Sequence, residues 1–421
     1  MFRTSQQRTS HHYWQVLAIA SLTIAVLSFV SPQIGTLGHG LRTALPALAV
    51  AWVAITRLAP QAFWLSFKRF RSFFLLGCLF LLQATLRFLY DDNKLDLFDR
   101  YVLNPLTLSF FLLWIGALAE LGQKTLNRFR VGILFGWSLS LALGVPELLA
   151  NPGVAKWVMG NVDAEQNASI YAPLGVGSYT TYTFLAICFV PMFVIIQKVN
   201  STIWRWCNIV LLILASLGVF LSTFSMASTL LAISIFFALL IWVMMAHGLA
   251  RFGRCFILLL PLLLLPIAYH YVENIPQIND VVSKVERLYG GIRSAGLQEG
   301  DETERGNWFI EELEAVIENP VAGYIPGVVG MRDNGHSSLS NSLVLFGIFG
   351  ALFWFCGLWK IFKDSLRYST HEIEKYALII AWVVLVLSGI LNPTWHSPAI
   401  GAFLALTVPV KNIHSTKAKY A

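Results

Sequence analysis

The sequence contains little charge. Only 13% of its 421 residues are Asp, Glu, Lys or Arg, against roughly 25% in a typical soluble domain. Apolar side chains make up 56% of the chain, and the mean hydropathy is +0.64. An ordinary soluble enzyme and an intrinsically disordered chain are both excluded, because neither carries so much apolar surface. The composition predicts an all-α, polytopic integral membrane protein.

Several motifs of cofactor-dependent enzymes are missing. The chain has no Walker loop, no Gly-x-Gly-x-x-Gly and no zinc-ligand spacing, so we expect no cofactor and no metal. No basic and aromatic cluster indicates a nucleic-acid partner. The five cysteines form no Cys-x-x-Cys pair and fall in or beside apolar runs, so we interpret them as small apolar core side chains. Any reaction must then draw its energy from the substrate or from a gradient.

Long apolar runs organise the chain. A membrane-spanning helix needs about 20 mostly apolar residues, and the runs between polar breaks give twelve candidate spans. The seventh and eighth are separated only by 222–226, so they are either two helices or one broken helix. The last is short enough to lie partly in the membrane interface. The runs are 14–31, 41–58, 73–90, 101–120, 131–147, 172–196, 205–222, 227–246, 254–270, 338–360, 375–391 and 396–410.

The basic residues predict the orientation of these spans, because Lys and Arg collect on cytoplasmic loops. With the N-terminus in the cytoplasm, most basic residues fall on that side, and an even number of spans returns the C-terminus there. Residues 1–270 are then expected to hold nine transmembrane helices, 271–336 a large external loop, and 337–421 three more helices and a cytoplasmic tail. The net charge of +7 therefore records orientation and not an acidic partner.

The external loop 271–336 is acidic, with twelve carboxylates against five basic residues. Within it, 307–318 predicts an amphipathic helix that carries Trp308 and Leu313 on one face and glutamates on the other. Asn-Pro at 319–320 ends this helix. The helix either lies on the bilayer surface and covers a cavity, or packs on the tops of the bundle helices.

Three external clusters carry groups suited to catalysis: Arg305 before the amphipathic helix, His336 at the start of the tenth span, and the turn 392–396. Histidine exchanges protons near neutral pH, and the arginine fork matches phosphate oxygens. An Arg beside a His can hold a lipid diphosphate while the His activates an acceptor hydroxyl. The alternative interpretation is that His336 is a solvated or capping residue and that Arg305 pairs with Glu302 or Glu304.

Arg87 also has two interpretations. It lies near the external end of the third run. A long basic side chain there ordinarily reaches up to the membrane interface. The functional alternative is a second phosphate contact that faces a cavity.

Four short motifs occur in order between 305 and 350. They are an Arg that opens an amphipathic helix, a Pro-x-x-Gly turn, a His-Ser that begins the next span, and a Gly-Ile-x-Gly after it. In this pattern the chain resembles the bacterial O-antigen polymerase (Wzy-type) and O-antigen ligase (WaaL-type) superfamily. The resemblance covers most of the chain in topology, and in sequence it is confined to about 305–350. The segments are 305–308, 318–323, 336–339 and 345–350.

The resemblance implies a GT-C-like membrane glycosyltransferase that faces the periplasm and uses an undecaprenyl-diphosphate-linked oligosaccharide as donor. Arg305 would contact the diphosphate, and His336 would act at the acceptor hydroxyl. The chain departs from the family in two places. Met226 follows a Ser-rich break where the family often carries an Arg, and the stretch 148–171 offers only Lys156.

Other arginines are therefore needed to complete a diphosphate site. Arg87, Arg287 and Arg293 are the candidates, and the sequence does not choose between them.

The pair His336-Ser337 bears on which member of the superfamily the chain resembles. Ligases usually have His-Asn there, whereas His-Ser is more like polysaccharide polymerases, so a polymerase is favoured. An O-antigen ligase that transfers glycan to lipid A-core is the alternative, and a flippase for lipid-linked oligosaccharide is the alternative from another class. The resemblance also implies the bacterial inner membrane and a chain-length regulator (Wzz-type) as a membrane partner.

Overall fold

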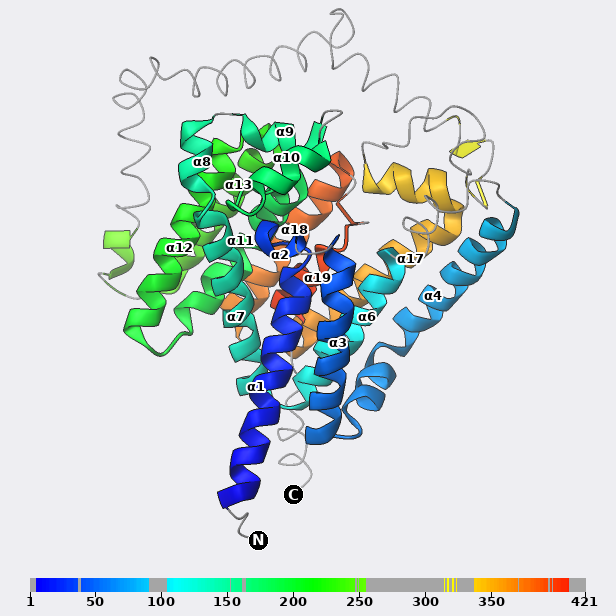
Figure 1. Cartoon of the computed structure of the whole chain (residues 1–421), viewed down its shortest axis with the longest axis horizontal. Helices are drawn as coiled ribbons and strands as arrows, with labels where there is room; N and C mark the ends of the chain where they lie inside the picture. Colours follow the sequence, from blue (N-terminus) through cyan, green and yellow to red (C-terminus); the bar gives the residue numbers. More distant parts are fainter. Residues whose placement is uncertain are drawn as a thin grey trace, which may run out of the picture.

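The computed structural model describes most of the chain as helices, and the described residues contain no strand. Figure 1 shows the start of α1 (Ser5–Leu27) at one end of the bundle, which we call the N-terminal end. Three short helices lie at the opposite end: α8 (Val145–Ala150), α9 (Val154–Gly160) and α10 (Ala164–Tyr171). We call this the α8–α10 end. The described residues are 5–36, 39–90, 104–151, 153–160, 164–246, 248, 250–254, 314, 316–317, 320–321, 323, 337–369, 371–392, 394–395 and 397–408.

Several helices are long and apolar enough to cross a membrane. The described part of the chain contains six of them, and a pair bent by 112°, at 42–58 and 62–79, would add a seventh. The protein is therefore an all-α, multi-pass membrane protein. Twelve spans stay a prediction, and the expected ninth span at 254–270 lies outside the described residues. The six are Gln123–Ala150, Tyr179–Gln197, Thr202–Leu221, Met226–Met244, Phe346–Tyr368 and Glu372–Ile390.

The N-terminal helices pack mainly in two pairs. Helix α3 (His39–Leu58) packs along α1, and α4 (Ala62–Tyr90) packs along α6 (Asn104–Glu120). The indole Nε1 of Trp114 on α6 donates to the carbonyl of Leu48 on α3 at 2.9 Å. Helix α3 ends just before Pro60, as expected from the restricted backbone ahead of a proline.

Helix α4 begins earlier than the sequence suggests. The third run was expected from residue 73, with the basic residues before it in a loop, whereas these residues form the first turns of α4. The guanidinium of Arg69 lies over the rings of Phe70 and Tyr368, at 5.5 and 5.1 Å from their centroids. Aromatic faces and nearby acidic groups stabilise a buried cation, so charge does not end the helix here.

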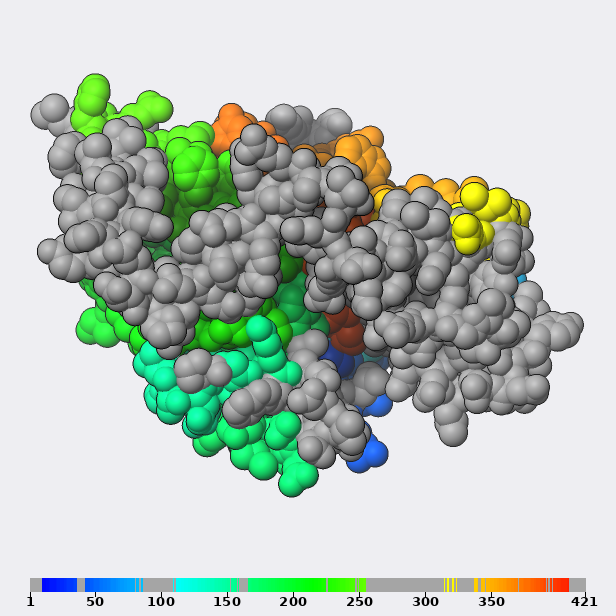
Figure 2. Space-filling model, turned by 90° about the horizontal axis from the view of Figure 1, so that it is seen from above, coloured from blue at the N-terminus to red at the C-terminus, as the bar shows by residue number. Residues whose placement is uncertain are grey.

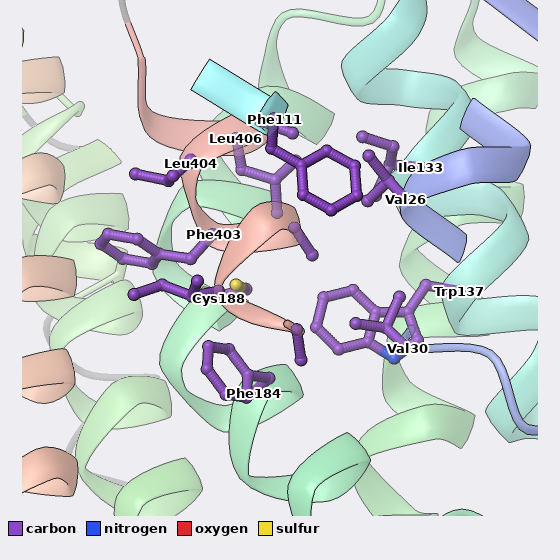
Figure 3. Close-up of a cluster of buried hydrophobic side chains, with 14 of the residues drawn as sticks. Val26, Val30, Phe111, Ile133, Trp137, Phe184, Cys188, Phe403, Leu404 and Leu406 are labelled. Atoms are coloured by element: carbon purple, nitrogen blue, oxygen red, sulfur yellow. The ribbon is translucent and has the colours of Figure 1, made fainter. Parts of the chain in front are cut away.

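The core lies around α11 (Tyr179–Gln197) and α19 (Ile400–Thr407). All of α19 is buried, as is most of α11. Figure 3 shows Phe403 on one side of α19 and Phe111 and Trp137 on the other, with Phe184 of α11 beside them. Segments from both ends of the sequence therefore contribute to the main hydrophobic cluster.

The last apolar run differs from the expectation for 396–410. It forms only the short helix α19, which is buried among the other helices. Arg130, which directly precedes the fifth apolar run at 131–147, lies within α7 (Gln123–Ala142). Its Nε donates to the carbonyl of Ala405 at 3.1 Å, and its Nη2 donates to the carbonyl of Val408. A cation at the last carbonyls of a helix satisfies them and complements the helix dipole, which allows α19 to end inside the protein.

The cysteines only partly follow the expectation of core side chains. Cys188 is buried in the core, but Cys78, Cys207 and Cys356 are exposed on their helices. These three side chains can be exposed because the outer surface of a membrane protein faces lipid tails. Lipid tails are as apolar as a protein core and tolerate a small apolar side chain. Cys255 lies outside the described residues.

Candidate functional site

Most of the predicted site residues lie in parts of the chain that the structure does not describe. This applies to His336, Arg305, Arg287 and Arg293. Arg87 lies in the last turns of α4, but its side chain is outside the described set, so neither of its interpretations is tested. What the structure does define is the segment that directly follows His336 and, earlier in the chain, part of the turn at 320–323.

The start of α17 (Ser338–Tyr368), directly after His336, is hydrogen-bonded to the turn that follows α18 (Glu372–Leu391). The backbone N and the hydroxyl of Ser338 both donate to the carbonyl of Asn392, at 3.2 and 2.9 Å. The Ser338 hydroxyl accepts from the backbone N of Trp395 at 2.9 Å. Two of the three clusters expected from the sequence, at 336 and at 392–396, are thus connected through their neighbouring residues.

Trp395 anchors this turn in the protein. Its indole Nε1 donates to the carbonyl of Leu385 on α18 at 3.1 Å. Its ring meets Phe355 of α17 edge-on, with 5.1 Å between the ring centroids. Below it, the hydroxyls of Thr394 and Ser388 are 2.9 Å apart. The turn is held by buried polar contacts on one side and by ring packing on the other, so it is a rigid base for the residues beside it.

Helix α17 breaks at Gly347, where φ is 60° and ψ is −154°. The turn at 320–323 packs into this break, and the backbone N of Ile348 donates to the carbonyl of Pro320 at 3.0 Å. A Cβ on Gly347 would lie 2.6 Å from the backbone N of Gly323. The Pro-x-x-Gly and the Gly-Ile-x-Gly motifs, distant in the sequence pattern, are therefore in direct contact.

Only part of the predicted amphipathic helix 307–318 is described. Glu314, Val316 and Ile317 are helical, and Ile317 is largely exposed. Figure 2, which views the α8–α10 end, shows the coloured residues of 314–323 on the far side of this face from α8–α10. Whether this helix lies on the bilayer or on the bundle stays open.

The Ser-rich break after the seventh run separates two helices. Helix α12 (Thr202–Leu221) ends there and α13 (Ser225–Met244) begins, and Thr223 between them has a φ of 60°. Phe224 packs edge-on against Tyr179, with 5.4 Å between the ring centroids. Met226, at the position of a family arginine, packs against the core, and Lys156 is exposed on α9.

Sequence reasoning missed Ser338 as the residue that joins the two clusters. The signal was present, because a serine at the start of an apolar run is a frequent cap of a helix N-terminus. What the sequence could not show was the partner, which lies 54 residues further along the chain. Among the described residues, no group of three or more His, Cys, Asp or Glu side chains is placed to hold a metal ion.

Replacement of Ser338 by alanine tests this framework. The change leaves the buried backbone N of Trp395 without its acceptor and removes the bond to Asn392, and we expect a loss of about 1–3 kcal/mol in stability. The measurement is the melting temperature of the purified protein in detergent. Ser216→Ala is the matched control, because that buried hydroxyl donates only to the carbonyl of Leu212 in its own helix. Equal melting temperatures for the two variants would contradict the proposed anchor.

Comparison with models of known protein families found no match, and comparison with curated proteins found none either.

Proposed function

We propose that the protein is a polysaccharide polymerase that transfers a growing glycan from its undecaprenyl-diphosphate carrier to a lipid-linked repeat unit at the periplasmic face. The proposal rests on the four ordered motifs at 305–350. It is supported by the contact between the turn at 320–323 and Gly347, and by the anchoring of the residue next to His336. The order of short motifs alone is weak evidence for a family. The contact between two of these motifs gives a physical reason why both occur in the chain.

The reaction requires a base for the acceptor and cations for the leaving group. The acceptor hydroxyl oxygen attacks the anomeric carbon of the donor, and its proton passes to His336. The bond from that carbon to the diphosphate breaks, and the diphosphate leaves with the bonding electrons. Arg305 stabilises the charge that develops on the diphosphate, with Arg87, Arg287 or Arg293 as a second contact. The glycan linked to the lipid diphosphate is already activated, so the reaction consumes no nucleotide sugar.

The proposal includes the finer topology. It has twelve spans in a GT-C-like arrangement in the bacterial inner membrane, with both termini in the cytoplasm and the α8–α10 end in the periplasm. The basic residues that precede or begin the spans support this orientation, for example Lys68 and Arg71 near the start of α4. A Wzz-type chain-length regulator is the proposed membrane partner.

Deletion of the gene in its bacterium tests the function. A polymerase deletion leaves surface glycan with a single repeat unit, because ligation and transport are intact. A ligase deletion leaves no glycan attached to lipid A-core, and a flippase deletion leaves undelivered repeat units on the cytoplasmic side. The measurement is a gel ladder of surface glycan, with complementation by the wild-type gene as control. Either of the last two outcomes would overturn the proposal.

Purified protein separates synthesis from transport. In liposomes without an ion gradient, we expect lipid-linked repeat units to be lengthened, since the diphosphate donor supplies the energy. Movement of lipid-linked oligosaccharide across the bilayer without lengthening would favour the flippase instead.

A further inference from the structure

An apolar groove runs along the outer surface of the bundle between α17 and α18. Its volume is about 320 Å³, and all of its lining side chains are apolar. Phe355 and Trp359 contribute from α17, Val383 and Val386 contribute from α18, and Trp395 also lines it. Both helices contain candidate membrane spans, so a groove on their outer surface opens to the hydrocarbon of the bilayer.

The groove is accessible from the lipid. Trp359 is 63% exposed, Val383 is 49% exposed and Val386 is 43% exposed, while Trp382 and Trp395 form its buried floor. A hydrocarbon chain can enter such a groove directly from the bilayer, without any separation of the helices. The volume lies at the low end of the range for small-molecule sites, about 300–1,000 Å³, which suits one segment of a long ligand.

The lining favours a flexible chain over a second protein helix. Transmembrane helices associate through Gly, Ala, Ser and Thr, which allow the two backbones to approach closely. The lining of this groove contains none of these residues and consists of Phe, Trp, Leu, Ile and Val. A rigid helix would meet bulky side chains, whereas a thin hydrocarbon tail can follow the hollow between them.

The groove shares a residue with the framework of the candidate site. Trp395 lines the groove with its side chain, and its backbone N is bound to the hydroxyl of Ser338, two residues after His336. A lipid tail in the groove would therefore leave its head group toward the end of the bundle at which the turn 392–395 and the start of α17 meet.

We propose that the α17–α18 groove binds part of the polyisoprenyl tail of the lipid diphosphate donor. This proposal rests on the proposed function, since it assumes that such a donor is used. It adds a location for the tail and assigns Val383, Val386, Trp382 and Trp395 to binding it. The groove would align the donor so that its diphosphate approaches the start of α17.

Photocrosslinking in nanodiscs tests the groove. The probe is a polyprenyl diphosphate with a diazirine in its tail, and crosslinked peptides are mapped by mass spectrometry. We expect labels on α17 and α18, at Phe355, Val383 or Val386. Val383→Trp fills the groove and is expected to lower this labelling about tenfold, equivalent to the loss of 1.4 kcal/mol of binding. Ile390→Trp is the matched control, because Ile390 is 46% exposed on the same helix but does not line the groove.

Two further arms distinguish the possible outcomes. A phosphatidylethanolamine with a diazirine in its acyl chain should label the groove less than the polyprenyl diphosphate probe does. Excess unlabelled undecaprenyl diphosphate should lower labelling by the polyprenyl probe, whereas excess phospholipid should not. Equal labelling by both probes, or equal loss in Val383→Trp and Ile390→Trp, would overturn the groove. Trp359→Ala, which enlarges the groove and has little effect on folding at an exposed position, should retain labelling.

The groove and the proposed function can fail separately. One outcome is specific labelling that Val383→Trp abolishes, in a wild-type protein that does not lengthen glycan. This outcome would support the proposed groove and contradict the proposed polymerase. The converse outcome is that Val383→Trp lengthens glycan at the wild-type rate and donor KM, and that no label is found on α17 or α18. This outcome would support the proposed polymerase and contradict the proposed groove.

Discussion

His336→Ala is expected to lower glycan polymerisation by about 10²–10⁴-fold, the usual contribution of a positioned general base or acid. The surface ladder should collapse to single repeats, as in the gene deletion. The protein should still be made and inserted at the wild-type level. The measurement is the lengthening of lipid-linked repeat units by the purified protein, together with the ladder in cells.

The framework beside His336 explains why the effect should be on catalysis and not on folding. The next residues, Ser337 and Ser338, are bonded to Gly389 and Asn392, and these bonds do not involve the histidine side chain. A base on a rigid anchor keeps its geometry relative to the acceptor, which is where most of its contribution arises. Removing the imidazole leaves this anchor in place.

His371 provides the matched control. It is exposed and also precedes a helix, as the residue before α18, but it lies at the other end of that helix from the turn 392–395. His371→Ala should polymerise like the wild type. The same assay on Arg305→Ala and Arg305→Lys separates charge from geometry, because lysine keeps the charge and loses the fork. A wild-type ladder in both His336→Ala and Arg305→Ala would refute the site.

The sequence predicted the helices whose apolar runs are bounded by polar residues. Helix α18 was expected at 375–391 and spans Glu372–Leu391, and α12 was expected at 205–222 and spans Thr202–Leu221. It failed where a charge is buried by tertiary contacts. Arg69 lies over Tyr368, which is almost 300 residues away, and no local pattern indicates such a partner. The position of Arg130 could not be predicted for the same reason, since its acceptors are the last carbonyls of α19.

The candidate site shows the same division. Residue types and their order pointed to the motifs at 320–323 and 347–350 and to the turn 392–396. Their contacts depend on the break in α17 and on the side chain of Ser338, which are properties of the folded chain. A glycine in an apolar helix is compatible with a close contact, a kink or neither, so the sequence alone did not identify the break at Gly347.

Gly347→Val should strongly destabilise the contact between α17 and the turn at 320–323. At φ 60° and ψ −154° the backbone is in a region that is almost restricted to glycine, and forcing another residue into it costs about 1–3 kcal/mol. The added side chain also overlaps the turn at 320–323, where its Cβ would lie 2.6 Å from the backbone N of Gly323. The turn must leave α17, or α17 must straighten. Either change separates the turn at 320–323 from the helix that begins beside His336, and we expect at least a tenfold loss of polymerisation.

Limited proteolysis distinguishes detachment of the turn at 320–323 from general unfolding. In Gly347→Val, cleavage within 271–336 should rise while the transmembrane helices stay protected. Gly218→Ala is the control, because that glycine is helical, and a Cβ there would meet its nearest neighbour at an ordinary 3.7 Å. Alanine is favoured over glycine in a helix by roughly 1 kcal/mol, so this control should melt no lower than the wild type. If Gly347→Val keeps the wild-type ladder and cleavage pattern, the contact between the two motifs has no role in positioning the loop, and the physical support for their order is lost.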